Sequence, residues 1–191
     1  MSWRSAHLMA FLVVLSCTRA EAIQPVKSLY TALDFAHCKP APGDRSGEAR
    51  MCAGLPGYPV YVSEGSRGTY LSVGPDAHKR RAARQTLRAF NTLFDKRGQR
   101  STIEWRFVVR GEQPVPYATI VRYFTESPSG AGEVLVVMRV TDREACQVAY
   151  VDALANLDAI VLARKLADTV ARQRSCPAEP AVQGAAGRSP M

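Results

Sequence analysis

The sequence predicts an α+β fold, in which an antiparallel sheet of about six strands carries a C-terminal helix packed on one face. Three patterns support this. Apolar residues alternate with charged ones from Ile103 to Val109, which predicts a half-buried strand. Residues 133–140 are apolar on both faces, which suits a central strand covered on two sides. After Asp152 the apolar spacing becomes helical, with the apolar face predicted at Leu157, Val161, Leu166 and Val170.

The remaining strands are predicted from turn residues. Residues 60–63 and 70–73 flank the segment 64–68, which is rich in glycine and polar residues, so they predict a hairpin. Residues 117–124 predict a returning strand, and residues 146–151 predict the last strand before the helix. The joint between that strand and the helix is acidic. We interpret it as helix capping rather than catalysis, with Asn156 as the N-cap and Asp158 in the first turn.

The N-terminal residues predict an export signal. Arg4 supplies a positive charge, residues 8–15 form a short apolar run, and residues 20–22 (AEA) form a cleavage site. We therefore divide the chain into a signal peptide (1–22), one domain (23–176) and a disordered tail rich in Pro, Gly and Ala (177–191). No later run approaches the roughly 20 apolar residues of a membrane-spanning helix, so no transmembrane segment is expected.

One alternative changes the N-terminus. Residues 14–17 (VLSC) resemble a bacterial lipobox, which would make the protein a lipoprotein anchored through Cys17.

Whether Cys17 is removed with the signal peptide or carries a lipid, four other cysteines remain, and an even count in an exported chain favours two disulfides. A strand from Cys146 followed by a helix packed back along it returns Cys176 to its start. The predicted pairs are therefore Cys38–Cys52 and Cys146–Cys176. No metal site or cofactor is predicted, because there is no CxxC spacing and only two histidines follow the signal peptide.

Positive charge is concentrated in one segment. Between residues 79 and 100 there are eight Lys and Arg against one Asp, which equals the whole excess charge of the chain after residue 22. If the segment is helical, Asp76 caps it and Arg80, Arg84 and Arg88 form a cationic stripe. Like charges at this spacing repel one another and cost stability. That cost suggests an anionic partner (a lipid head group, lipopolysaccharide or an acidic polymer), although a merely solvated face explains the same charges. The predicted partner-binding residues are Arg80, Arg81, Arg84 and Arg88.

Catalytic patterns are missing from the sequence. It has no nucleophile motif of the G-x-S-x-G type, no H-E-x-x-H and no phosphate-binding glycine loop. His37 adjoins a predicted disulfide cysteine, and His78 begins the basic segment. No catalytic residue is therefore assigned, and a binding module is preferred to an enzyme. The alternative is a carboxylate-dependent envelope hydrolase, in which four carboxylates would converge at one end or face of the sheet: Glu64, Glu104, Glu126 and Asp152.

Several stretches together resemble a family of small exported alphaproteobacterial proteins of unassigned function. They are residues 30–39 (YTALDFAHCK), 57–65 (GYPVYVSEG), 90–93 (FNTL), 102–106 (TIEWR) and 146–156 (CQVAYVDALAN). The resemblance implies a Gram-negative periplasmic setting and supports the four cysteines as a framework, but it supplies no catalytic residue. The expected function is that of an exported periplasmic or secreted module that binds the envelope through its basic segment. Nucleic acid is not an expected partner.

Overall fold

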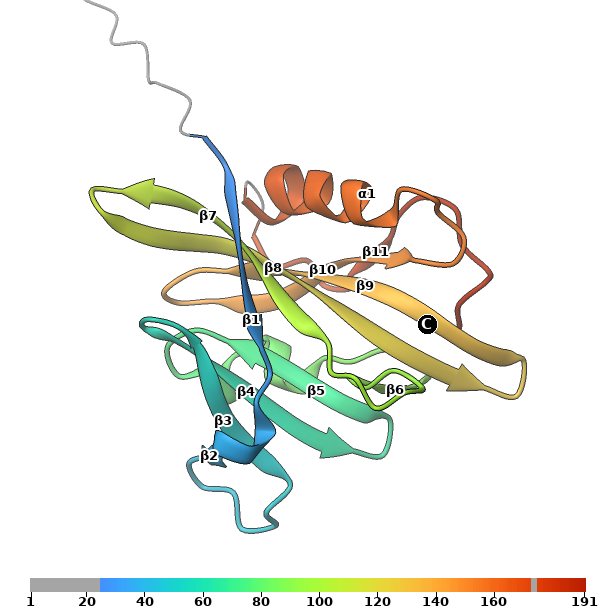
Figure 1. Ribbon diagram of the computed structural model, residues 1–191, viewed down its shortest axis with the longest axis horizontal. Coiled ribbons are helices and arrows are strands. Elements are labelled where there is room, and N and C mark those ends of the chain that lie inside the picture. The colour runs from blue at the N-terminus through green and yellow to red at the C-terminus, as the bar shows by residue number, and fades with distance from the viewer. Residues whose placement is uncertain (1–24, 173–174) are drawn as a thin grey trace, which may run out of the picture.

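A computed structural model describes residues 25–172 and 175–191. The predicted signal peptide and Cys17 lie outside these residues. The described chain is mostly β, with 11 strands in one mixed sheet and a single helix near the C-terminus (Figure 1). The prediction of an α+β fold with about six antiparallel strands is therefore wrong. The strands are β1 (Lys27–Ala32), β2 (Lys39–Pro40), β3 (Ala49–Leu55), β4 (Tyr58–Gly65), β5 (Gly68–Val73), β6 (Phe90–Thr92), β7 (Thr102–Arg110), β8 (Gln113–Ser127), β9 (Gly130–Val140), β10 (Ala145–Asp152) and β11 (Ala181–Val182).

Strand β8 joins two layers of this sheet. One of its edges pairs with β9 along residues 118–127. The other edge is shared, because β7 pairs with residues 113–121 and β6 pairs with residues 124–126. Through β6 the sheet continues into the meander of β5, β4, β3 and β2, while β7 carries the edge strand β1. Figure 1 shows the meander as a layer of its own beneath β7 to β10.

The pairings are not all antiparallel. Strand β11 runs parallel to β10, and β6 meets β5 in parallel at the single pair Gly68 and Asn91. Both strands are very short, and a strand of two or three residues carries almost no periodic signal in the sequence. The six-strand prediction missed them for this reason.

Two hydrophobic cores cover the central strands. Val134, Val136 and Met138 of β9 pack into the core between the two layers, together with Trp105. Leu135 and Val137 of β9 point into a second core beneath the helix. The prediction that residues 133–140 form a strand covered on both sides is confirmed.

The helix α1 (Ala159–Leu166) continues through one π-helical turn, η4 (Ala167–Ala171). The face packed on β9 and β10 consists mainly of alanines: Ala159, Ala163, Ala167 and Ala171, with Leu166. The predicted face is right at two of its four positions, because Leu166 is buried and Val170 packs against the same core. It is wrong at the other two, because Leu157 is 106% exposed and Val161 is 60% exposed. Small side chains let the helix approach the sheet closely, and a hydrophobicity pattern favours the larger Leu and Val. The N-cap is Asp158 instead of the predicted Asn156.

A buried polar network fixes the helix to β7. Glu104 accepts hydrogen bonds from Arg164 Nε at 2.8 Å and from Ser28 Oγ at 2.6 Å. Arg106 donates to both carboxylate oxygens of Asp168, at 3.0 and 2.6 Å. The polar face of β7, expected to be solvent-exposed, is thus covered by the helix and β1.

The structure contains two disulfides, Cys38–Cys52 and Cys146–Cys176, which is the predicted pairing. Their Cα–Cα distances are 4.3 and 5.9 Å. Disulfides persist in oxidising surroundings, so the protein belongs to a compartment other than the cytoplasm. Among the described residues, no helix combines the length and the apolar character needed to cross a bilayer.

The C-terminal segment, whose composition predicts a disordered tail, is packed on the sheet from residue 181 onward. Strand β11 pairs with β10, and Asn156 exchanges hydrogen bonds with the backbone of Ala185. Asp152 is fully buried and accepts three hydrogen bonds from Arg188 and Ser189, through both backbone N–H groups and the Ser189 hydroxyl. Polar side chains of the strand–helix joint therefore hold this segment.

The alanine face leads to a testable prediction. Ala163→Leu inserts a larger side chain at a position with 0% exposure, so we expect the free energy of unfolding to fall by about 1–3 kcal/mol. Leu157→Ala changes a fully exposed side chain and should alter it by less than about 0.5 kcal/mol. Urea denaturation of both variants measures the difference. If Leu157→Ala is the more damaging change, the helix does not pack through its alanines.

Candidate functional site

The basic segment, residues 79–100, is not an α-helix. Two short 3₁₀ turns, η2 (Ala77–Lys79) and η3 (Arg81–Arg84), lie at its start, and the chain then runs irregularly to β6. Arg80, between the two turns, has extended backbone, so Arg80, Arg84 and Arg88 do not form a helical stripe. The predicted capping role of Asp76 is also absent, since its side chain makes no cap hydrogen bond.

The first part of this segment, residues 79–88, lies between β5 and β10. Ala82 and Leu87 are buried in the core between the two layers. The Gln85 side chain accepts a hydrogen bond from the Gln147 backbone at 2.9 Å, and the Gln147 side chain donates to the Gln85 carbonyl at 3.1 Å. The Thr86 hydroxyl donates to the Thr69 carbonyl of β5 at 2.7 Å. Buried side chains and hydrogen bonds therefore hold this part of the segment in place against β5 and β10.

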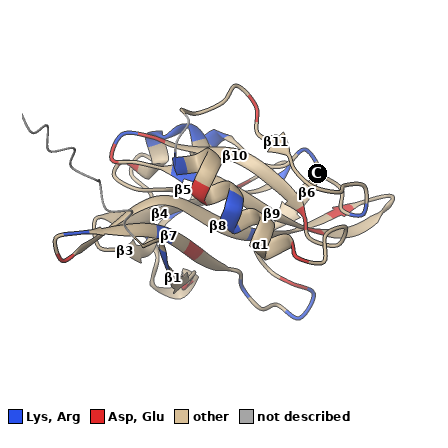
Figure 2. Cartoon of the chain, turned by 90° about the horizontal axis from the view of Figure 1, so that it is seen from above, with Lys and Arg blue, Asp and Glu red and all other residues tan. Residues whose placement is uncertain are grey.

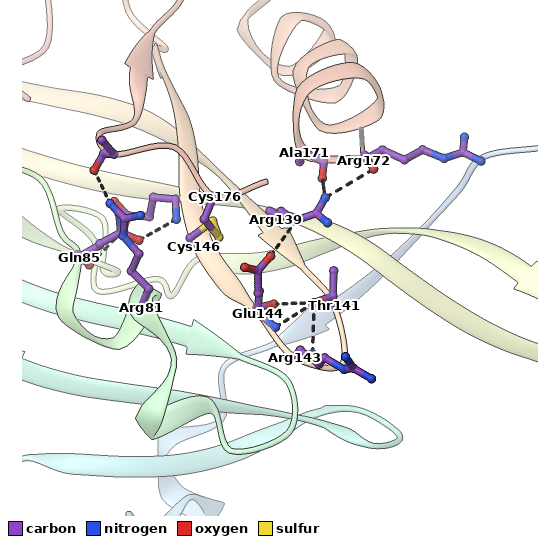
Figure 3. The surroundings of a disulfide bond; sticks show 12 residues. Arg81, Gln85, Arg139, Thr141, Arg143, Glu144, Cys146, Ala171, Arg172 and Cys176 are labelled. Atoms are coloured by element: carbon purple, nitrogen blue, oxygen red, sulfur yellow. Dashed lines mark hydrogen bonds and ion pairs between the residues drawn. A yellow bond between two sulfur atoms is a disulfide. The ribbon is translucent and has the colours of Figure 1, made fainter. Parts of the chain in front are cut away.

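Two of the predicted binding arginines have structural partners. Arg80 donates to the backbone carbonyls of Pro75 and Asp142, at 2.8 and 2.7 Å. Arg81 donates to the carbonyl of Ala178 in the C-terminal segment, close to the Cys146–Cys176 disulfide (Figure 3). Arg84 and Arg88 are exposed. The only contact described for either guanidinium is a loose one between Arg88 and Glu179, at 3.8 Å.

The charges from residue 79 to residue 100 lie at three different places on the structure. Arg100 lies over the rings of Phe35 and Phe94, at 5.4 and 5.9 Å from their centroids, and donates to the Leu33 carbonyl. Lys96 and Arg97 line a different hollow, beside β8 and β9. Only residues 79–88 lie beside β5 and β10, where Figure 2 shows several blue stretches close together.

We call the hollow between the basic segment and the C-terminal segment the arginine groove. Its volume is about 810 Å³. Arg67, Arg81, Arg84 and Arg88 line it, and Glu179 is the only acidic side chain among the described residues around it. Tyr70 of β5 and Tyr150 of β10 also line the groove, together with the polar side chains of Gln85 and Thr86. The C-terminal segment completes the lining with Ala178, Pro180, Val182 and Met191.

Arg67 is positioned by Asn91. The Asn91 side chain, buried in β6, donates to the Arg67 carbonyl at 2.8 Å, and its Oδ1 lies 3.1 Å from the Thr86 hydroxyl, whose single hydrogen it shares with the Thr69 carbonyl. The β4–β5 turn fits closely against it, because a Cβ on Gly68 would lie 1.8 Å from the Asn91 carbonyl oxygen. Gly68 also has φ +103°, a conformation that favours glycine. These contacts bring a turn arginine beside the basic segment.

Electrostatics in the groove favour anions. Guanidinium groups remain charged at any physiological pH and bind carboxylates and phosphates with paired hydrogen bonds. Burial raises the pKa of Tyr150 to about 12, against a smaller opposing effect of Arg88. The Tyr150 phenol therefore stays neutral and donates to the Gln147 side chain.

Sequence reasoning identified Arg81, Arg84 and Arg88 but missed Arg67, both tyrosines and Glu179. These residues come from the β4–β5 turn, β5, β10 and the C-terminal segment, which are far apart in the chain. The one available signal was the predicted hairpin, which places Arg67 in a turn, but nothing in the sequence indicates that this turn contacts residue 91.

The four carboxylates of the alternative hydrolase do not come together among the described residues. Glu104 is engaged by Arg164 beneath the helix, and Asp152 is engaged by the C-terminal segment. Glu64 lines a hollow of about 240 Å³ with Arg50 and Arg100. Glu126 lines the separate hollow beside β8 and β9.

Glu64 has an altered pKa without a catalytic arrangement. Burial raises the pKa of Glu64 above its ordinary value, and the hydrogen bond from the Thr69 hydroxyl opposes this only in part. Glu48 is the only other acidic side chain among the described residues around that hollow. The described residues also contain no group of three or more His, Cys, Asp or Glu side chains that could hold a metal ion.

A His–Asp pair is present but isolated. His37 Nδ1 lies 2.6 Å from Asp34, and the side chains are 84% and 55% exposed. The neighbouring Cys38 is consumed in a disulfide, so it cannot serve as a nucleophile. The pair acts within the η1 turn (Phe35–His37), where Asp34 also accepts from the Ala36 backbone.

No protein-family model matches the chain, and neither the curated proteins nor the solved structures contain a significantly similar one.

The burial of Asp152 leads to a pH-dependent prediction. Burial alone would raise its pKa, but hydrogen bonds from Ser189, Arg188 and Ala155 together lower the pKa below 3.8. A lowered folded-state pKa stabilises the fold above the unfolded pKa, and this stabilisation is lost as pH falls through the folded value. We expect Asp152→Asn to lower the free energy of unfolding by about 2 kcal/mol at pH 7 and by less below about pH 4.

The control for this measurement is Asp158→Asn, at an exposed carboxylate with no capping hydrogen bond. It should change stability little at either pH. Hydrogen exchange should also show the amides of residues 181–189 losing protection in Asp152→Asn alone. Equal protection in the two variants would mean that Asp152 does not hold the C-terminal segment.

Proposed function

We propose that this protein is a non-enzymatic binding module of the bacterial periplasm or cell exterior that holds an anionic envelope component in the arginine groove. The observation that carries the proposal is the groove itself, which gathers four arginines against one glutamate. The disulfides support an exported protein, and the family resemblance supports the periplasm. The isolated positions of the candidate carboxylates favour binding over hydrolysis.

The exposed arginines are those available to a ligand. Arg67 and Arg84 are exposed, and no ion pair is described for either side chain in residues 25–172 and 175–191. Arg88 has only its loose contact with Glu179, and exposed pairs of this kind contribute little to stability. Arg80, by contrast, is held by two backbone carbonyls, so we assign it to the fold and no longer to the binding surface.

The binding test uses Arg67→Gln combined with Arg84→Gln. Lipopolysaccharide, phosphatidylglycerol vesicles and polygalacturonate are the three anionic probes, each tested in low salt and in 1 M salt. We expect at least one probe to bind in low salt and to be released in 1 M salt, where the screening length falls to about 3 Å. The double variant should weaken that binding at least about tenfold, with an unchanged melting temperature.

The matched control is Arg45→Gln combined with Arg110→Gln, which removes the same charge from exposed sites outside the groove. It should bind like the parent. If both double variants lose affinity equally, the binding reflects net charge, and the basic segment is a solvated face. If no probe binds, the proposed function fails.

Replacing Glu179 should strengthen anion binding, whereas replacing the arginines should weaken it. Among the residues that the structure describes, the Glu179 carboxylate is the one acidic side chain that competes with a ligand for Arg88. Glu179→Gln should therefore raise the affinity for whichever probe binds, by about two- to threefold as for a weak exposed pair. Titration in low salt measures this. Unchanged or weaker binding would show that the ligand does not reach Arg88.

A further inference from the structure

A second basic hollow adjoins the arginine groove. It has a volume of about 500 Å³ and is lined by Lys79, Arg80, Arg81 and Arg143. Two acidic side chains, Asp76 and Glu144, also line it, so its side chains carry a net positive charge. We call it the side basin. Arg81 belongs to both hollows, which makes them neighbours along one surface.

We infer that the two hollows together bind an extended acidic polysaccharide, in which carboxylates repeat along a chain of sugar rings. This inference rests on the proposed function and names the class of ligand for the same groove. Together the hollows present seven different basic side chains against three acidic ones. A single small anion needs only two or three of these groups, whereas a repeating polyanion can engage all of them except Arg80, which its two backbone contacts assign to the fold.

The boundary between the hollows is the contact of Arg81 with the Ala178 carbonyl. It uses one terminal nitrogen of the guanidinium, which leaves the other N–H groups of Arg81 for a ligand. A chain lying over this contact would meet Arg84 and Arg67 on one side and Lys79 and Arg143 on the other. Lys79 and Arg143 are themselves paired only loosely, with Asp76 at 3.6 Å and Asp142 at 3.7 Å.

The lining distinguishes a glycan from other polyanions. The half-buried rings of Tyr70 and Tyr150 offer apolar faces, and Gln85 and Thr86 offer amide and hydroxyl groups. Sugar rings present both C–H faces and hydroxyls, so they match this mixture. Polyphosphate would use the cations alone. A lipid head group in a flat bilayer would not enter a groove bounded on two sides by chain segments.

The test measures binding of galacturonate oligomers of defined length in low salt. We expect decagalacturonate to bind at least about tenfold more tightly per chain than trigalacturonate, because engaging the second hollow becomes intramolecular. Lys79→Gln combined with Arg143→Gln should abolish this gain and leave trimer binding unchanged. Arg67→Gln combined with Arg84→Gln should weaken both lengths. Arg45→Gln combined with Arg110→Gln is again the control.

The outcomes separate the two proposals. If the trimer and the decamer bind alike, or if the side-basin variant weakens both equally, the extended-chain inference is overturned and the groove stands as a small-anion site. If lipopolysaccharide binds through the groove and galacturonates do not, the ligand class is wrong and the proposed function survives. Tighter binding of a single-stranded oligonucleotide or polyphosphate of matched charge would likewise overturn the polysaccharide. No groove-dependent binding of any anion would overturn both.

Discussion

The division of one edge of β8 between two partner strands determines the rest of the structure. A strand edge can hydrogen-bond to only one neighbour at each position, so β7 must end its pairing before β6 begins. Because β6 leads into the meander and β7 leads to β1, the sheet separates into two layers at this point. The layers enclose one core, and the side between β5 and β10 is left for another segment to close. The basic segment does so through Gln85, Leu87 and Thr86.

Buried polar contacts decide how the outer parts attach to this frame. The pairs Glu104–Arg164 and Arg106–Asp168 set the position of an alanine-faced helix that has few large apolar side chains to fix its register. A buried ion pair contributes little net stability, since desolvation offsets the attraction, but a misplaced helix would leave these charges unpaired. Asp152 has a similar role for the C-terminal segment. That segment then forms one wall of the arginine groove, which connects the strand–helix joint to the site.

Sequence patterns predicted those features that depend on local periodicity. The two-sided character of residues 133–140, the hairpin around residues 64–68 and both disulfides follow from side-chain alternation, turn residues and element lengths. The helix face was predicted only at Leu166 and Val170, because its other buried positions are mainly alanines. Val161 is exposed, and Leu157 is exposed and precedes the helix. Strands β2, β6 and β11 consist of two or three residues and exist through long-range pairing alone. The groove was visible only as a basic segment, since its other residues come from separate parts of the chain.

The arginines of the groove are not explained by the fold. Closing the side between β5 and β10 requires the buried Ala82 and Leu87 and the hydrogen bonds of Gln85 and Thr86, and Arg80 and Arg81 add backbone contacts of their own. Within residues 25–172 and 175–191, no such contact is described for the side chains of Arg67 and Arg84, and Arg88 has only its loose pair with Glu179. Gathering like charges also raises the electrostatic energy of the folded state. A single glutamate in the groove offsets little of that repulsion. An anionic ligand would offset the rest, and for this reason we assign the exposed arginines of the groove to binding and the buried and hydrogen-bonded residues of the segment to the fold.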